Sequence, residues 1–204
     1  MLLHWSPRSP FVHKVMVALA ETGLRPRVEL TRSVVPTADP GHAIFRVNPL
    51  GQIPTLVADD GRVLHDSLVI CLHLHELCGE EILLPRAADR WLEPLRRHAL
   101  GQGLTEAMVG WVAERAQPAE KQVAARVQRH ALKLEKTLEL LEADPGLRDP
   151  RRFDLGDIAV ATALAYVDFR SLKPGWPDEY PKAAAWLAHA SQRPSMVAAR
   201  LREG

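Results

Sequence analysis

The hydrophobic pattern of the chain changes between its two halves, and this change restricts the possible folds more than any other feature. In residues 1–78, short apolar runs typical of strands alternate with runs that have the spacing of a helix face. From about residue 88 onward, almost every apolar run has helical spacing. The sequence therefore predicts an α/β domain in residues 1–78, a linker in residues 79–88 and an all-α domain in residues 89–204.

The N-terminal segment predicts a strand, a helix and a second strand. Residues 2–5 form a short apolar run, residues 11–22 place apolar side chains along one helix face, and residues 28–30 form the next strand. Ser9 is a suitable N-cap, and Pro10 suits the first helical position. A strand joined to a helix by a tight junction is the opening of a βαβ unit.

The rest of the α/β half predicts a short helix, a hairpin and a longer helix. Two strand-like runs flank a turn that contains Asp-Gly, which is a hairpin signal. Asp66 and Ser67 are placed to cap the last helix, and Gly79 is placed to end it. The expected ranges are 42–47 for the short helix, 54–58 and 62–65 for the strands, and 68–77 for the last helix.

The C-terminal half predicts a series of helices separated by proline and glycine. The expected ranges are about 88–113, 119–142, 155–171, 180–193 and 195–202. Asp154 and Asp157 precede the apolar residues 158–160 of the third of these helices with the spacing of a capping box. Asp154 would accept a hydrogen bond from the amide of Asp157, whose carboxylate favours the positive end of the helix. The pair is expected to start that helix.

The charge distribution argues against a nucleic-acid partner. The chain has 26 basic and 25 acidic residues, a formal net charge of +1 and no run of five or six like charges. It therefore lacks the basic patch that nucleic-acid binding needs. The longest apolar runs are also too short to span a membrane. We expect neither nucleic acid nor a membrane as a partner.

Cysteine usage indicates a reducing compartment. Cys71 and Cys78 lie in one apolar segment, and both are expected to be buried packing residues. A disulfide framework would need more cysteines at separated positions. Residues 1–7 lack the basic region and the long apolar run of a signal peptide. The expected location is the cytoplasm.

Several histidines near the last helix of the α/β half have the composition of a metal site. They are His65, His73 and His75, with Glu76 beside them. His73 and His75 are two residues apart, so they point to different faces of a helix, unlike the i, i+4 pairs that metals use. We expect no metal.

Four motifs, in their order and spacing, resemble those of bacterial glutathione S-transferases over essentially the whole chain. The run SPRSPFVHKV at residues 6–15 resembles the first strand–helix junction of that family, and NPLGQIP at residues 48–54 resembles the segment that leads to its cis-proline. Asp66-Ser67 resembles the pair that holds the γ-glutamyl end of glutathione, and residues 154–157 resemble a folding motif of the helical domain. The resemblance implies a thioredoxin-like α/β domain followed by an all-α domain, and a homodimer.

The resemblance also implies which residues bind glutathione: Ser9, Gln52, Ile53, Pro54, Asp66 and Ser67. Asp66 would pair with the glutamyl ammonium, and Ser67 would bind the glutamyl carboxylate at a helix N-terminus. A plain helix cap is the alternative for this pair. A cis Ile53–Pro54 bond would present the backbone groups of Ile53 to the peptide as a strand edge does. Gln52 and Arg8 are possible partners of the glycyl carboxylate, and contact with bulk solvent is the alternative for both.

Ser9 is the expected catalytic residue, and Ser6 is its rival. A free thiol has a pKa near 8.5, so only a few per cent of it is thiolate at neutral pH. A hydroxyl that donates to the sulfur, at the positive end of a helix, stabilises the thiolate. A helix cap that does not contact the sulfur is the alternative for Ser9. His13 stands where many bacterial relatives carry arginine, and it is expected to be solvated.

The implied function is that of a glutathione S-transferase, in which the activated thiol attacks a small hydrophobic electrophile, a detoxifying reaction. Relatives with cysteine at the position of Ser9 exchange thiols through a mixed disulfide, which an oxygen cannot form. The two tyrosines, Tyr166 and Tyr180, lie outside the N-terminal half, which excludes the tyrosine-dependent branches. Glutathione-dependent isomerisation or peroxide reduction, and a non-catalytic glutathione-binding scaffold, stay open as alternatives.

The site of the second substrate is less defined by the sequence. Met108, Trp111 and Tyr166 are candidates for its apolar wall, because the helical half is expected to face the thiol. Core packing is the alternative for each of them. Such generic apolar residues do not specify which electrophile is used.

Overall fold

A computed structural model describes residues 1–33, 42–149 and 151–203 of the chain. The described chain forms two compact units, one of Met1–Arg90 with Pro194–Gly204 and the other of Trp91–Arg193. None of the helices among the described residues combines the length and the apolar character needed to cross a bilayer. The residue ranges expected for the two domains and their linker stay a prediction.

The first unit is built on a four-stranded mixed sheet in the order β2-β1-β3-β4. Strands β1 and β2 are parallel, whereas β3 pairs antiparallel with both β1 and β4. The strands are β1 at Leu2–Trp5, β2 at Glu29–Arg32, β3 at Thr55–Val57 and β4 at Val63–Leu64. This is the strand–helix–strand, then hairpin, order that the sequence predicts.

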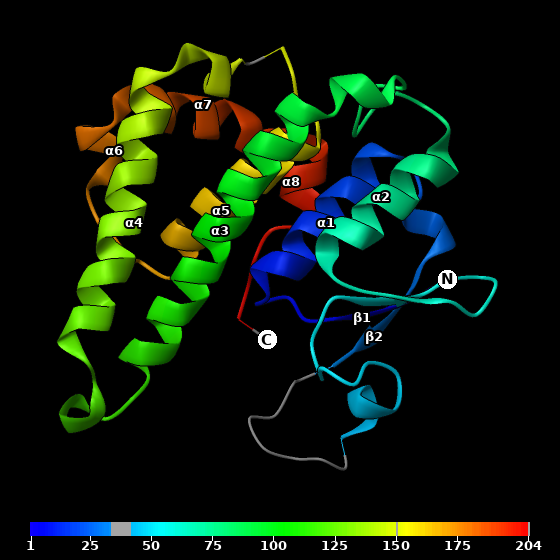
Figure 1. Ribbon diagram of the computed structural model, residues 1–204, viewed down its shortest axis with the longest axis horizontal. Coiled ribbons are helices and arrows are strands. Elements are labelled where there is room, and N and C mark those ends of the chain that lie inside the picture. Colours follow the sequence, from blue (N-terminus) through cyan, green and yellow to red (C-terminus); the bar gives the residue numbers. More distant parts are fainter. Residues whose placement is uncertain (34–41, 150, 204) are drawn as a thin grey trace. The chain divides into compact units, whose positions relative to one another are not determined.

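Helices α1 (Pro10–Glu21) and α2 (Ser67–Cys78) pack against each other in this unit (Figure 1). Apolar side chains of both helices and of the strands are fully buried, among them Leu3, Val15, Leu19, Leu56, Ile70 and Leu74. The expected short helix at 42–47 is a 3₁₀ helix, η2, at Ala43–Arg46. Another, η1, at Arg25–Arg27, leads into β2.

The end of the chain belongs to this first unit. Helix α8 (Pro194–Ala198) packs on α1, and the Ser195 hydroxyl donates a hydrogen bond to the Glu21 carboxylate of that helix. The residues after α8 also contact the β1–α1 connection, where the Arg202 amide donates to the Pro7 carbonyl at 3.2 Å. The helix expected at 195–202 is therefore shorter than predicted: it ends at Ala198, and Arg202 contacts Pro7 instead of continuing the helix.

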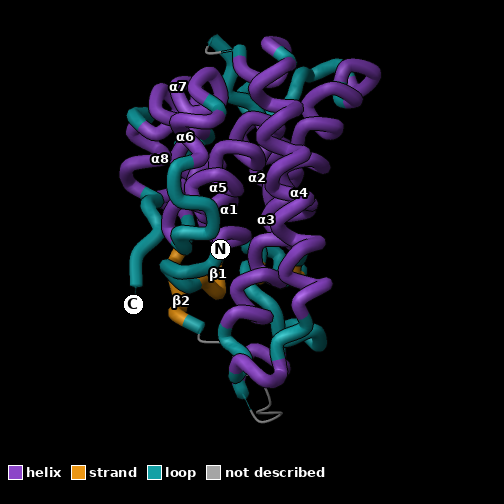
Figure 2. The backbone as a smooth tube through the Cα atoms, turned by 90° about the vertical axis from the view of Figure 1, so that its left-hand side faces the viewer, coloured by secondary structure: helices purple, strands orange, loops and turns teal. Residues whose placement is uncertain are grey.

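The second unit is helical. Its longest helices, α3 (Leu92–Arg115) and α4 (Ala124–Ala143), run side by side (Figure 2). The other helices are α5 at Leu155–Phe169, α6 at Trp176–Glu179 and α7 at Pro181–Ser191, with 3₁₀ turns η3 at Ala88–Arg90, η4 at Ala119–Lys121 and η5 at Pro145–Arg148. The helix expected at 180–193 is thus preceded by α6, which starts inside the Pro-Gly-Trp-Pro segment expected to separate two helices.

Helix α5 is the core of the second unit. All but a few of its side chains are buried, and it packs closely on α3 because Gly101 leaves no side chain between the two backbones. The capping box predicted at its start is confirmed: Asp154 accepts from the Asp157 amide at 3.2 Å, and Asp157 accepts from the Asp154 amide at 3.1 Å. Arg97 of α3 forms ion pairs with both carboxylates.

Candidate functional site

Sheet register brings the three predicted binding segments to one end of the first unit. His4 of β1 lies opposite Thr55 of β3, so the residues after β1 lie beside those before β3. Leu56 of β3 lies opposite Leu64 of β4, so the residues after β4 lie at the same end. The junctions that carry Ser9, Ile53-Pro54 and Asp66-Ser67 therefore meet there.

Ser9 is the N-cap of α1. Its backbone is extended, and its Oγ accepts a hydrogen bond from the Val12 amide at 3.3 Å, while Pro10 occupies the first helical position. Because the oxygen is the acceptor in this bond, the Ser9 O–H proton is free to be donated elsewhere. The rival, Ser6, accepts from the Arg8 amide at 3.4 Å and does not cap the helix. Both serines are half-buried and line the same cavity.

The segment before β3 is held rigid by buried polar groups. The Asn48 side chain is fully buried and donates to the Gln52 carbonyl at 3.2 Å and to Thr55 Oγ1 at 2.9 Å. Thr55 Oγ1 donates to the same carbonyl at 2.7 Å. Asn48 and Thr55 were given no role from the sequence, although an asparagine before proline in an apolar context is a signal for such internal bonding.

Gly51 completes this segment. Its φ is +62°, a conformation that favours glycine, and a Cβ there would lie 2.4 Å from the Phe45 ring, which would have to move aside. The Ile53–Pro54 peptide bond that follows is cis, as the family resemblance implies. Within the described residues, no hydrogen bond joins the amide or carbonyl of Ile53 to another backbone group. Gln52 uses its carbonyl internally, and its side chain is exposed.

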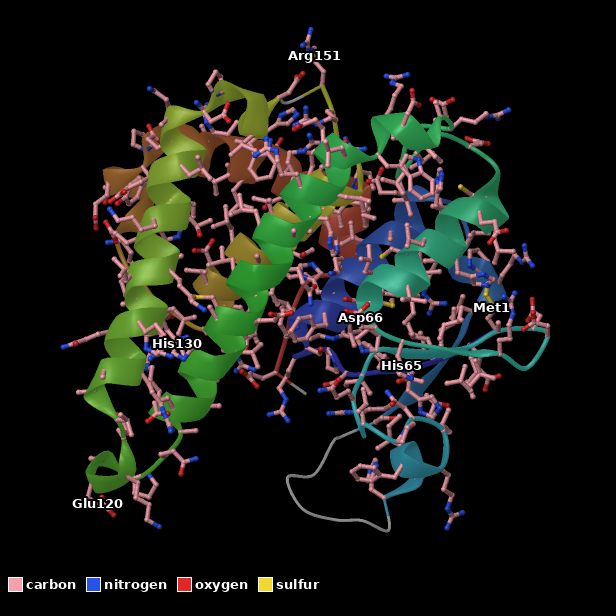
Figure 3. All side chains as sticks on the ribbon, in the orientation of Figure 1. Met1, His65, Asp66, Glu120, His130 and Arg151 are labelled. Carbon is pink, nitrogen blue, oxygen red and sulfur yellow. The ribbon has the colours of Figure 1, made fainter. Side chains whose placement is uncertain are left out.

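Asp66 and Ser67 start α2. Asp66 is the N-cap and accepts from the Leu68 amide at 3.0 Å and from the Val69 amide at 3.4 Å. Figure 3 shows His65 and Asp66 at this point, where the connection from β4 reaches the helix; the bond between them is also cis. The Ser67 side chain is only 1% exposed, and its Oγ has no hydrogen-bond partner among the described residues. A buried hydroxyl without a partner is rare in proteins and is therefore a candidate ligand contact.

Cys71 is the cysteine closest in sequence to Asp66 and Ser67, and its thiol is not reactive. Burial raises the pKa of Cys71 to about 12, against which Lys14 has a smaller, opposite effect. Cys71 is a buried packing residue as expected, whereas Cys78 is only half-buried; both are free. Among the described residues, no group of His, Cys, Asp and Glu is arranged to hold a metal ion.

His13 is not solvated, contrary to the expectation from the sequence. Its side chain is 3% exposed, because it lies on the α1 face covered by the chain end. Burial lowers the pKa of its imidazole to about 4, so the ring is neutral near pH 7. The sequence pattern missed this because a histidine one turn after an N-cap has no intrinsic preference for either face.

The candidates for the second-substrate wall all lie in the helical unit. Met108 of α3 and Tyr166 of α5 are buried, with 0% and 3% exposure. Trp111 of α3 is half-buried, and its indole Nε1 has no hydrogen-bond partner among the described residues. Burial is the packing role that the sequence left open for Met108 and Tyr166, and their contact with a substrate stays a prediction.

Comparison with known proteins decides the family. The family model of the glutathione S-transferase N-terminal domain matches residues 8–77, and that of the C-terminal domain matches residues 124–189. The chain belongs to the glutathione S-transferase family. A GST-like protein of Escherichia coli K12, YibF, which is described as uncharacterized, is 32% identical over 97% of this chain and 96% of its own length.

Solved transferase structures have the same fold over the whole chain. A glutathione transferase family member from Pseudomonas fluorescens Pf-5, with bound glutathione, has a TM-score of 0.90 and 38% identity, covering 99% of each chain. A glutathione S-transferase from Methylobacillus flagellatus KT, also with glutathione bound, has a TM-score of 0.85 and 31% identity, covering 98% of this chain and 99% of the other. The fold is therefore a thioredoxin-like α/β domain followed by a mostly helical C-terminal region.

Proposed function

We propose that the chain is a glutathione transferase that activates the glutathione thiol for attack on a small hydrophobic electrophile. The observation that carries this proposal is the convergence of Ser9, Ile53 and Ser67 at one end of the sheet, each with a hydrogen-bonding group unused by the described part of the protein. Family membership and glutathione in the relatives' structures support it.

Asp66 and Ser67 would hold the γ-glutamyl end. The ammonium needs an anionic partner as it leaves water, and the Asp66 carboxylate lies at the start of α2. The glutamyl carboxylate would accept from the Ser67 hydroxyl, which has no partner among the described residues, where the helix dipole favours an anion. In this role Asp66 keeps its capping bonds, since a carboxylate oxygen accepts more than one hydrogen bond.

The middle of the tripeptide would pair with the backbone of Ile53. The amide and carbonyl of this residue make no backbone hydrogen bond within the described residues, and an extended peptide pairs with such groups as an added strand does. Pro54 fixes the backbone beside them. The exposed Gln52 side chain is our candidate for the glycyl carboxylate.

Ser9 would act on the sulfur. Its free O–H proton would be donated to the thiolate at the positive end of α1, which lowers the pKa of the glutathione thiol below its ordinary value near 8.5. The thiol proton is lost to solvent, and the thiolate forms a bond to an electrophilic carbon. The electron pair of the bond that breaks at this carbon goes to a leaving group, or to an adjacent atom that is then protonated. Ser9 forms no covalent bond at any step.

The remaining features of the proposal follow from the family. We infer a homodimer, a cytoplasmic location and a detoxifying role, with Met108, Trp111 and Tyr166 as candidates for the wall that faces the electrophile. Isomerisation and peroxide reduction use the same thiolate on another electrophile, and a scaffold would bind glutathione without turnover. These alternatives are separated by activity measurements.

The test is turnover of glutathione with a panel of electrophiles that includes a peroxide and an isomerisable substrate. Ser9→Ala should lower kcat by about 100-fold, the usual effect of removing one donor to a developing anion. The Kd for glutathione should change by less than about threefold, because the peptide contacts lie elsewhere. Ser6→Ala is the matched control and should keep wild-type turnover. A loss with Ser6→Ala and not with Ser9→Ala would transfer the role to Ser6; binding without any turnover would support the scaffold.

A further inference from the structure

A cavity of about 210 Å³ lies within the first unit, separate from the groups proposed to hold the peptide. It is lined by one face of α1, by residues of β1, β2 and η1, and by residues 198–202 at the end of α8 and after it. None of Gln52, Ile53, Pro54, Asp66 and Ser67 lines it. It shares only the serines of the β1–α1 junction with the proposed site.

The chain end that covers this cavity is held in place by defined contacts. The Arg202 amide donates to the Pro7 carbonyl at 3.2 Å, and the Arg8 guanidinium lies 3.7 Å from the Glu203 carboxylate. The Ser195 hydroxyl, in α8, donates to Glu21 of α1. The wall that the chain end forms is therefore part of the folded unit.

His13 points to a ligand in this cavity. Its side chain is 3% exposed and lines the cavity, yet neither ring nitrogen has a hydrogen-bond partner among the described residues. Buried polar groups are almost always paired, so a buried imidazole with two unused nitrogens beside a cavity indicates a ligand that pairs with it. Because burial holds the pKa of His13 near 4, the ring is neutral and offers one N–H donor.

The charged side chains that line the cavity, among the described residues, are all positive. Arg25, Arg200 and Arg202 line it, and among the described residues no aspartate or glutamate does. The Arg25 guanidinium donates to the Val28 carbonyl at 2.7 Å, which holds it in place. An anion would gain from this field and would accept the His13 N–H.

The remaining walls and the volume define the body of the ligand. Trp5, Met16 and Leu30 contribute apolar surface. An apolar cavity of about 150 Å³ is large enough for benzene, so this cavity has room for one aromatic ring with a small substituent. We propose that the cavity binds a small aromatic carboxylate, with its ring against these apolar side chains and its carboxylate accepting from His13 in the field of the three arginines.

Benzoate is the probe, and the measurement is calorimetric titration of the full chain without glutathione, which makes the result independent of the proposed transferase activity. Benzoate should bind at one site, and benzyl alcohol, which lacks the charge, should bind at least about tenfold more weakly. His13→Phe fills the space and removes the donor, so benzoate binding should be lost. Arg200→Gln should weaken it several-fold. Arg27→Gln, which changes an arginine of the same 3₁₀ turn as Arg25 that does not line the cavity, is the matched control and should have no effect.

Equal affinity for benzoate and benzyl alcohol, or benzoate binding that neither the His13 nor the Arg200 variant weakens, would overturn the proposal. So would the absence of binding to the wild-type chain. If His13→Phe does not fold, the imidazole nitrogens of His13 in ¹⁵N-histidine-labelled wild-type protein serve instead. The chemical shifts of these nitrogens should change as benzoate is added, until the site is saturated. Chemical shifts that do not change would contradict the proposed site.

Discussion

At position 9 the chain carries a hydroxyl and not a thiol, and this one atom separates two chemistries on the same fold. The Ser9 oxygen already caps α1 through the Val12 amide, so a sulfur there would occupy the positive end of the same helix. Ser9→Cys should therefore create a thiolate that forms a mixed disulfide with oxidised glutathione, detected as the mass of one glutathione added to the chain. Ser6→Cys, outside the capping position, is the control and should be modified more slowly. Equal or faster modification of Ser6→Cys would show that the sulfur of glutathione lies nearer Ser6.

The burial of His13 makes stability depend on pH. The imidazole has a pKa of about 4 when folded and about 6.5 when unfolded, so the unfolded chain binds a proton first as the pH falls. Above about pH 6.5 the burial of His13 causes no loss in the free energy of unfolding. As the pH falls from 6.5 toward 4, this free energy falls by about 3 kcal/mol in total. Urea denaturation at neutral pH and near pH 4 measures this loss.

His13→Leu removes the titrating group and should reduce the loss of stability on acidification by about that amount. His189→Leu, which replaces an exposed histidine of α7, is the matched control. It should lose as much stability on acidification as the wild type. An unchanged pH dependence in His13→Leu would mean that His13 is not held neutral by the fold.

At the scale of elements, the contact between α3 and α5 depends on Gly101. A Cβ at this position would lie 2.4 Å from the backbone carbon of Ala159, which cannot move aside as a side chain does. Gly101→Ala should lower the free energy of unfolding by about 2 kcal/mol or more, as overpacking does. Gly103 lies on the same helix, and a Cβ there would have no described atom within 4 Å, so Gly103→Ala should raise stability by about 0.5–1 kcal/mol through helix propensity. Two equal effects in chemical denaturation would contradict the close packing of these helices.

The elements themselves were largely predictable, because their signals are local. Ser9 with Pro10, Asp66 before α2 and the Asp154–Asp157 box each mark a helix start through hydrogen bonds made within a few residues. What the sequence missed depends on contacts far apart in the chain. The burial of His13 and the early end of α8 accompany packing of the chain end on the first unit. Helix α6 begins at Trp176, which donates to Asp168 of α5 at 2.7 Å.

At the scale of the whole molecule, the sequence predicts the order of the two folds, and the structure adds the convergence of three junctions at one end of the sheet. Sheet order and register are then enough to bring Ser9, Ile53 and Ser67 together, whatever the surrounding side chains are. The sequence did not reveal the unused hydroxyl of Ser67 or the Asn48–Thr55 support, because each depends on which polar atoms find a partner after folding.

Assembly is the prediction that belongs to this scale. We expect a homodimer, so sedimentation equilibrium should give twice the chain mass of 22.7 kDa. Exposed apolar side chains of the first unit, such as Leu50 at 61% and Val69 at 42% exposure, are available for such an interface. Leu50→Asp should shift the equilibrium toward the monomer, because dimer formation would then remove a charged side chain from water. Leu92→Asp, at another exposed position in the helical unit, is the comparison. A wild-type chain that sediments at 22.7 kDa at all concentrations would contradict the dimer.

The position of the glutathione sulfur tests the central claim most directly. A crystal structure of the chain with glutathione should place the sulfur within hydrogen-bonding distance of Ser9 Oγ, with the glutamyl end at Asp66 and Ser67 and the peptide backbone against Ile53. A sulfur beyond the reach of Ser9 Oγ, or in contact with Ser6 Oγ instead, would contradict the role proposed for Ser9.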